Sequence, residues 1–248
     1  MEVKYLFSCI YVGWTLVFAL PAAEADERQR IETPRFILYV GEDDRTGSSQ
    51  SLSAVQVANQ VLRTLAETND ELLRIFKYSP ERKVVLRFLN PDEFQKHTGA
   101  PSWTSAMYFR NEISMPIEPG AVDIEDLRTA ARHEYVHAFL AAMTKSHIPA
   151  WLDEGLAQII EGEPNPILAP ALRTWIARRD AIRLKMLRDG FTTLQDTYVP
   201  VAYAQSLFVT RTLINKHGMK SIVKFLNALR QAQPEDKAFQ AAFSIPQD

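Results

Sequence analysis

The chain has 248 residues, of which 46% are hydrophobic and 23% are charged. These fractions are those of an ordinary globular protein, and the length allows one domain with a substantial core, or a two-lobed domain with a cleft. The formal net charge of -2 gives no electrostatic footprint for nucleic acid, so no nucleic acid partner is expected.

The N-terminus shows the three parts of a secretory signal peptide. A short head over residues 1–4 precedes a continuous apolar run over 5–20, and an Ala-x-Ala pattern ends at Ala25. The apolar run is short for a membrane span, so we expect cleavage after Ala25, export to the periplasm or the medium, and no membrane span in the mature chain. The alternative is an uncleaved anchor, because Glu2 weakens the basic head. The only cysteine, Cys9, lies in this leader, so the mature chain is expected to form no disulfide.

Residues 26–118 show the patterns of a small α/β lobe. The first seven, 26–32, are polar and are expected to be loose. The β-branched run at 83–89 is typical of a strand in the middle of a sheet. In chain order, the patterns predict a strand over 34–40, a helix over 51–76, a strand over 83–89, a short helix over 90–98 and a hairpin over 105–116.

The next helical pattern, over 126–143, carries His133, Glu134 and His137. Residues four apart on a helix lie one above the other, so the two imidazoles point at one place with Glu134 beside them. Two neutral imidazoles and a carboxylate ligand would leave a zinc ion one open position, where a water loses its proton near neutral pH and Glu134 could take it. The alternative is a buried helix whose histidines bond to their neighbours. Asp123 or Asp126 is expected to cap the helix.

A third ligand is predicted on the following helix. Pro149 opens this second apolar pattern after a short connection, which allows the helix to fold back antiparallel to the first and places Glu154 on it. A third histidine soon after His137 would be an alternative ligand, but the residues that follow are apolar. His147, in the connecting turn, is expected to be a solvated loop residue.

His133-Glu134-x-x-His137, followed at 151–157 by Trp-Leu-Asp-Glu-Gly-Leu-Ala, resembles the gluzincin metallopeptidases and most closely their peptidase MA-like domains. The resemblance implies an α+β, zincin-like fold, with an N-terminal α/β lobe that contains a small mixed sheet, a central metal-binding helix and a helical C-terminal lobe. Asp153 stands where the similar aminopeptidases usually carry asparagine. The resemblance also implies that Glu161, seven residues after Glu154, could orient a ligand histidine. The alternative is that Glu161 is a solvated carboxylate at the helix end.

The resemblance suggests roles for two further parts of the chain. In gluzincins an edge strand before the metal-binding helix pairs with extended substrate, and the hairpin at 105–116 has this place in the order, although it could simply be sheet. In gluzincins a tyrosine from the C-terminal lobe also donates a hydrogen bond to the oxyanion that forms during hydrolysis. Tyr203 is the candidate here, with Tyr108 and Tyr198 in reserve. The alternative is that Tyr203 is a packed tyrosine with a satisfied hydroxyl. Helices are predicted over 169–187, 199–217 and 219–231, with a last short one at 238–243.

Together these patterns predict a zinc metallopeptidase domain over 26–248 that acts on a peptide or protein. Zn²⁺ is expected to be held by His133, His137 and Glu154, with Glu134 as general base and Tyr203 as oxyanion donor. One alternative is a zinc-stabilised binding or assembly protein of the cell envelope with the same fold and no turnover. Another is a dormant peptidase that needs a partner or the removal of a covering segment.

Overall fold

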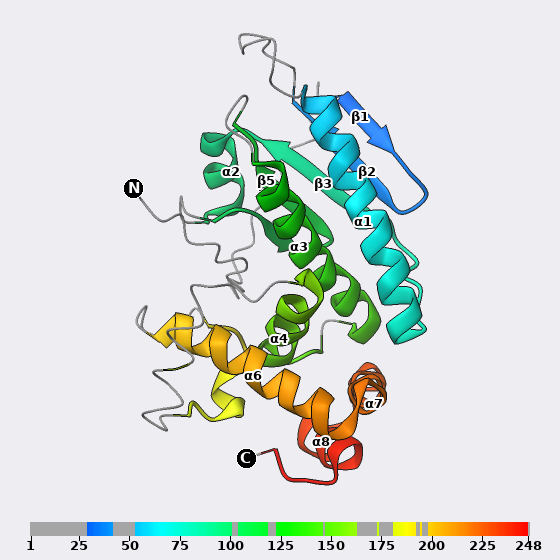
Figure 1. The fold of residues 1–248 in the computed structure, drawn as a ribbon, viewed down its shortest axis with the longest axis vertical. Coiled ribbons are helices and arrows are strands. Elements are labelled where there is room, and N and C mark those ends of the chain that lie inside the picture. The colour runs from blue at the N-terminus through cyan, green and yellow to red at the C-terminus, as the bar shows by residue number, and fades with distance from the viewer. Residues whose placement is uncertain are drawn as a thin grey trace.

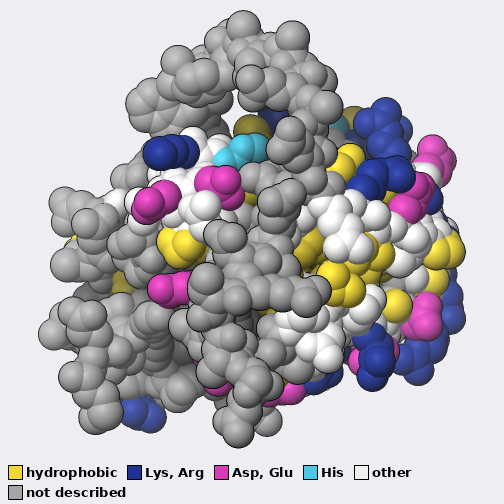
Figure 2. All heavy atoms as spheres, turned by 90° about the horizontal axis from the view of Figure 1, so that it is seen from above, with side chains coloured by type: hydrophobic (Ala, Val, Ile, Leu, Met, Phe, Trp, Pro, Cys, Tyr) yellow, Lys and Arg dark blue, Asp and Glu magenta, His cyan; other side chains and the backbone are white. Residues whose placement is uncertain are grey.

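The computed structural model describes residues 29–41, 53–100, 104–118, 123–145, 147–162, 173, 181–191, 194 and 198–247. The predicted leader lies outside these residues. None of the helices in the described ranges has both the length and the apolar character that crossing a membrane requires. Figure 2 shows acidic and basic side chains interspersed on the described part of one face, as the near-neutral charge leads one to expect.

A mixed sheet forms the N-terminal lobe (Figure 1). Within the described residues it has five strands in the order β1-β2-β3-β5-β4. The pairs β2–β3 and β3–β5 are parallel, whereas β1–β2 and β4–β5 are antiparallel. The predicted mixed sheet, the central place of the 83–89 strand and the hairpin are therefore confirmed. The strands are β1 (Gln29–Glu32), β2 (Phe36–Val40), β3 (Val84–Leu89), β4 (Met107–Phe109) and β5 (Glu112–Pro116).

The prediction that 26–32 is loose is wrong for its last four residues, which form strand β1. Three of these four residues are polar, as is usual for an edge strand, so composition alone does not reveal the strand. Pairing with β2 gives hydrogen-bond partners to the backbone groups that face β2, and Ile31 packs against the hydrophobic core. Glu32 is also held by Lys83, whose Nζ lies 2.5 Å from its carboxylate.

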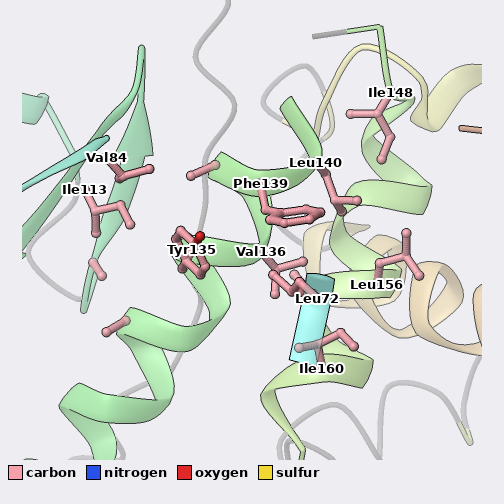
Figure 3. Packing of buried hydrophobic residues seen from close by; sticks show 14 of the residues in the cluster. Leu72, Val84, Ile113, Tyr135, Val136, Phe139, Leu140, Ile148, Leu156 and Ile160 are labelled. Atoms are coloured by element: carbon pink, nitrogen blue, oxygen red, sulfur yellow. The ribbon is translucent and has the colours of Figure 1, made fainter. Parts of the chain in front are cut away.

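Helices cover both faces of the sheet. Helices α1 (Ala54–Phe76) and α3 (Ile124–Thr144) pack on one face, and α2 (Pro91–Thr98) covers the other through a small apolar cluster that includes Phe94. In Figure 3, Tyr135 and Phe139 of α3 lie between the sheet residues Val84 and Ile113 on one side and helix α4 on the other. Helix α3 is therefore the central element that joins the sheet to the helical part of the molecule.

The C-terminal lobe is helical and lies below the sheet in Figure 1. It contains α4 (Ala150–Glu161), the short 3-10 helix η1 (Leu184–Leu187), α6 (Val199–His217), α7 (Met219–Arg230) and α8 (Glu235–Phe243). An aromatic cluster holds α4, α7 and α8 together, since Phe239 contacts the rings of Trp151, Phe225 and Phe243. The architecture is α+β, and the helices predicted over 199–217 and 219–231 are confirmed.

The helix predicted over 169–187 is wrong at its C-terminal end. Residues 181–183 are not helical and η1 is only one short turn; except for residue 173, the remainder of this prediction lies outside the described residues. The cause is Gln205 on α6, whose Oε1 accepts from the N–H of Ile182 at 2.9 Å and whose Nε2 donates to the Ile182 carbonyl at 2.5 Å. Because both backbone groups of Ile182 are taken by one side chain, they cannot continue a helix.

Candidate metal centre

Helix α3 places His133 and His137 on its buried side. Asp123 caps the start of the helix, and its carboxylate accepts from the N–H of Glu125 at 2.9 Å. Its middle is tied to α1, because the Tyr135 hydroxyl donates to Asn69 Oδ1 at 2.8 Å. With the helix fixed in this way, the two imidazole centroids lie 4.8 Å apart, as the four-residue spacing predicts.

Glu154 reaches the same point from α4. Its Oε2 lies 3.5 Å from His133 Nε2 and 3.8 Å from His137 Nε2. Ligand atoms that surround one zinc ion tetrahedrally, at bond lengths of about 2.1 Å, are separated by about 3.4 Å. The three residues thus have the spacing of a metal site, and their ligand atoms all lie within 4.8 Å of one another.

The burial of these atoms also fits a metal. His133, His137 and Glu154 are each at most 3% exposed. Across the described chain, the two Nε2 atoms and the Glu154 Oε2 make no hydrogen bond and no contact with solvent. Buried polar atoms are normally satisfied, so these atoms could instead be satisfied by a shared cation.

A carboxylate stands behind each histidine. Glu161 Oε2 lies 2.5 Å from His133 Nδ1, and Asp153 Oδ1 lies 3.0 Å from His137 Nδ1. The Glu161 contact is a hydrogen bond, which fixes the proton of His133 on Nδ1 and leaves its Nε2 for a metal, whereas Asp153 and His137 form an ion pair without hydrogen-bond geometry. The Glu161 contact is the one that the resemblance implies. The sequence patterns do not assign Asp153 to His137; the signal was its place directly before Glu154, with a carboxylate where the similar enzymes carry an amide.

Glu134 lies beside the histidines and is fully buried. Its Oε2 accepts a hydrogen bond of 2.7 Å from the backbone N–H of Tyr108 on β4. The predicted general base and the predicted substrate strand are therefore in direct contact. This backbone donor could not be read from the sequence, because it depends on how the hairpin docks against α3.

The match to known families decides the identity of this fold. The family model described as the peptidase MA superfamily matches residues 86–247, which include every residue of the centre. The chain belongs to the peptidase MA superfamily. A search of curated proteins gives no match. Superfamily membership supports peptidase-type activity, and the α+β arrangement is that of a zincin-like peptidase MA domain.

The electrostatics of this peptidase MA centre favour a bound cation. Burial alone lowers the pKa of both histidines, but the facing carboxylates outweigh it. In the metal-free protein the pKa of His133 is raised well above 6.5, and that of His137 rises to about 9 because of Asp153 and Glu154. Burial raises the pKa of Glu154, although both histidines oppose this effect. At neutral pH, protons therefore occupy positions that a metal ion would take.

Arg132 fixes the far end of α4 relative to this centre. Its Nε donates to the Ile160 carbonyl, and its Nη2 lies 2.5 Å from the Glu71 carboxylate on α1. Arg132 lies on α3, but its guanidinium is placed at the last turn of α4. There it gives a terminal carbonyl a hydrogen-bond donor and interacts favourably with the negative end of the helix dipole. The next residue, Glu161, is the partner of His133, so Arg132 holds in place the segment from which that carboxylate reaches the histidine.

The structure separates the remaining candidates. Tyr203 lies on α6, which packs against α4. Its ring centroid lies 5.0 Å from that of Phe191, and its backbone carbonyl accepts from Gln158 at 3.1 Å. These contacts do not involve the hydroxyl, and the role of Tyr203 as oxyanion donor stays a prediction. Tyr108 is on β4, and Tyr198 is 51% exposed at the start of α6. His147 is an exposed loop residue, as predicted.

Proposed function

We propose that the protein is a zinc peptidase of the gluzincin type in which His133, His137 and Glu154 hold Zn²⁺. The observation that carries this proposal is the convergence of three buried ligand atoms that make no hydrogen bond, from two helices, with the Glu134 carboxylate alongside. Bound zinc would supply a Lewis acid and lower the pKa of a coordinated water.

The residues of the chain then divide the proton transfers and the binding between them. Glu134 takes a proton from the attacking water as the new C–O bond forms, and passes it to the leaving amine as the C–N bond breaks. Tyr203 donates a hydrogen bond to the developing oxyanion. The substrate is a peptide or protein segment, which pairs in extended form with the edge strand β4.

Hydrolysis of a quenched peptide library by the zinc-loaded protein, with and without a chelator, tests this proposal. We expect cleavage that the chelator abolishes. Glu134→Gln should keep zinc and lose hydrolysis, because the amide cannot take a proton, whereas His133→Ala should lose zinc. Hydrolysis that persists in purified Glu134→Gln protein would refute the assignment.

A second candidate is a zinc-stabilised binding or assembly protein of the cell envelope. The complete burial of the ligand atoms favours it, because a structural zinc site is closed to solvent. Zinc would then raise the melting temperature in the same way for the wild type and for Glu134→Gln, and no peptide in the library would be cut. The library assay thus separates the two functions.

We also propose that the protein is exported, on the basis of the leader pattern in residues 1–25. N-terminal sequencing of the protein recovered from the periplasm or the medium should give a chain that begins at Asp26. Recovery of the intact N-terminus in the membrane fraction would favour the uncleaved anchor instead.

A further inference from the structure

The hairpin of β4 and β5 turns the N–H of Tyr108 away from its partner strand. Arg110 and Asn111 form the two-residue turn with φ of 47° and 71°, which places Tyr108 opposite Ile113. In such a hairpin, hydrogen-bonded and non-hydrogen-bonded pairs alternate along the strands. Because the Tyr108 N–H donates to Glu134 Oε2, Phe109 and Met107 are left to make the bonds to β5.

We propose that this backbone N–H is a positioning group for the general base. The inference rests on the proposed function, in which Glu134 takes the proton. The Glu134 carboxylate is fully buried, and a charge-assisted bond of 2.7 Å fixes one of its oxygens in space. With Oε2 fixed, the rotamer of Glu134 and the direction of Oε1 are set by β4 and not by α3 alone.

This arrangement couples the base to the site where substrate would pair. Strand β4 is the last strand of the described sheet, and the Tyr108 N–H at its outer edge is taken by Glu134. An extended peptide that adds to this edge would therefore pair with other backbone groups of β4, such as the Tyr108 carbonyl, next to the residue that holds Glu134. A small displacement of β4 would then move the base and the scissile bond together. Positioning of this kind acts on the chemical step, so its loss lowers kcat more than it raises KM.

Amide hydrogen exchange tests the bond without any need for activity. In the wild type, the Tyr108 amide should be protected although it faces away from β5. In Glu134→Ala its protection should fall about tenfold or more, while the Phe109 amide, paired to β5, keeps its protection. Equal protection of Tyr108 in both proteins would overturn the inference.

Kinetics of Tyr108→Pro and Tyr108→Ala test the consequence. Proline removes the N–H and leaves the bonds to β5 intact, since edge strands accept proline where the N–H points outward. We expect kcat to fall about tenfold to a hundredfold with KM nearly unchanged and zinc content retained. Tyr108→Ala keeps the N–H and measures what the side chain alone contributes, so its kcat should fall at least about tenfold less than that of Tyr108→Pro.

The outcomes distinguish the possible failures. An equal loss in both variants would assign the effect to the tyrosine side chain, and a rise in KM alone would assign it to substrate pairing; either result overturns the inference. If the Tyr108→Pro variant loses its fold or its zinc, the amide exchange of the wild type and of Glu134→Ala decides whether the bond exists. If the wild type cleaves no peptide with zinc bound, the proposed function fails, whatever the exchange rates show.

Discussion

Helices α4 and α6 approach each other so closely at Gly155 that a single methyl group should disturb the site. A Cβ added to Gly155 would lie 2.1 Å from Thr210 Oγ1 and 2.5 Å from the backbone carbonyl of Ser206. Ordinary contact begins at 3.4 Å, so α6 would have to retreat by about 0.9 Å from the carbonyl alone. Thr210 could rotate its hydroxyl away, but its Cβ, 2.7 Å from the added atom, and the Ser206 backbone carbonyl cannot be moved by rotation.

The expected cost of Gly155→Ala follows from two opposing terms. Overpacking a close-packed interface costs about 1–3 kcal/mol or more, and alanine returns about 1 kcal/mol through its higher helix propensity. Because a backbone carbonyl is involved, we expect the upper part of the range and a net loss of about 2 kcal/mol in the free energy of unfolding. Glu154 is the preceding residue, so the zinc affinity should fall as well.

Urea unfolding of the metal-free and zinc-loaded proteins measures both effects. Gly41→Ala is a matched control, since nothing lies within 4 Å of an added Cβ there, and it should change the unfolding free energy by less than about 0.5 kcal/mol. Adding Thr210→Ala to Gly155→Ala should restore only part of the loss, because the Ser206 carbonyl remains. Full restoration by Thr210→Ala, or an unchanged urea midpoint for Gly155→Ala, would refute the proposed close contact of the two helices.

Four further predictions concern the metal centre. At pH 7, zinc binding should release close to two protons, because the pKa values of His133 and His137 are raised in the metal-free protein; calorimetry in buffers of different ionisation enthalpy measures the number. For the same reason, the protonated histidines stabilise the metal-free fold. This stabilisation is complete below pH 6.5 and is lost as the pH rises through about 9. Urea unfolding of chelated protein across this range measures it, and a flat profile would contradict the assignment. Asp153→Asn and Glu161→Gln should each weaken zinc binding about tenfold to a hundredfold in a chelator competition, while an exposed carboxylate replaced in the same way should have no effect. Arg132→Leu should cost about 2 kcal/mol of unfolding free energy and weaken zinc binding in the same assay, and an unchanged affinity would show that Arg132 does not control Glu161.

Much of the architecture could be predicted because local signals agree with the tertiary structure. The helix predicted over 51–76 is observed as α1, which begins at Ala54 after a capping box in which Ser53 and Gln56 satisfy each other's backbone groups. The turn at Arg110 and Asn111 and the β-branched run at 83–89 are similarly local. The spacing of the two histidines required only that α3 be a helix, which its pattern and its Asp123 cap ensured.

What could not be predicted depends on contacts between distant segments. Strand β1 is polar and exists because β2 offers it a free edge. The helix predicted up to 187 ends early because Gln205, more than twenty residues away along the chain, bonds both backbone groups of Ile182. Likewise, the donor to Glu134 is a backbone N–H, which carries no mark in the sequence of β4. Each of these failures is a place where tertiary hydrogen bonding overrides local preference.

The contacts around the centre show why a metal would do more than complete an active site. Glu154 comes from a helix whose position is set by its close contact with α6, whereas His133 and His137 belong to the helix that packs on the sheet. Without a metal, the buried ligand atoms of these two helices lie close together with no hydrogen-bond partner. Protonation of the histidines is then what stabilises the Glu154 carboxylate between them. A bound divalent ion would therefore join the sheet lobe to the helical lobe at the level of α3 and α4. Since binding energy for the folded form adds to its stability, the zinc-loaded protein should unfold at a higher urea concentration than the chelated protein. If chelation left the urea midpoint of the protein unchanged, the metal could not be the link between the lobes.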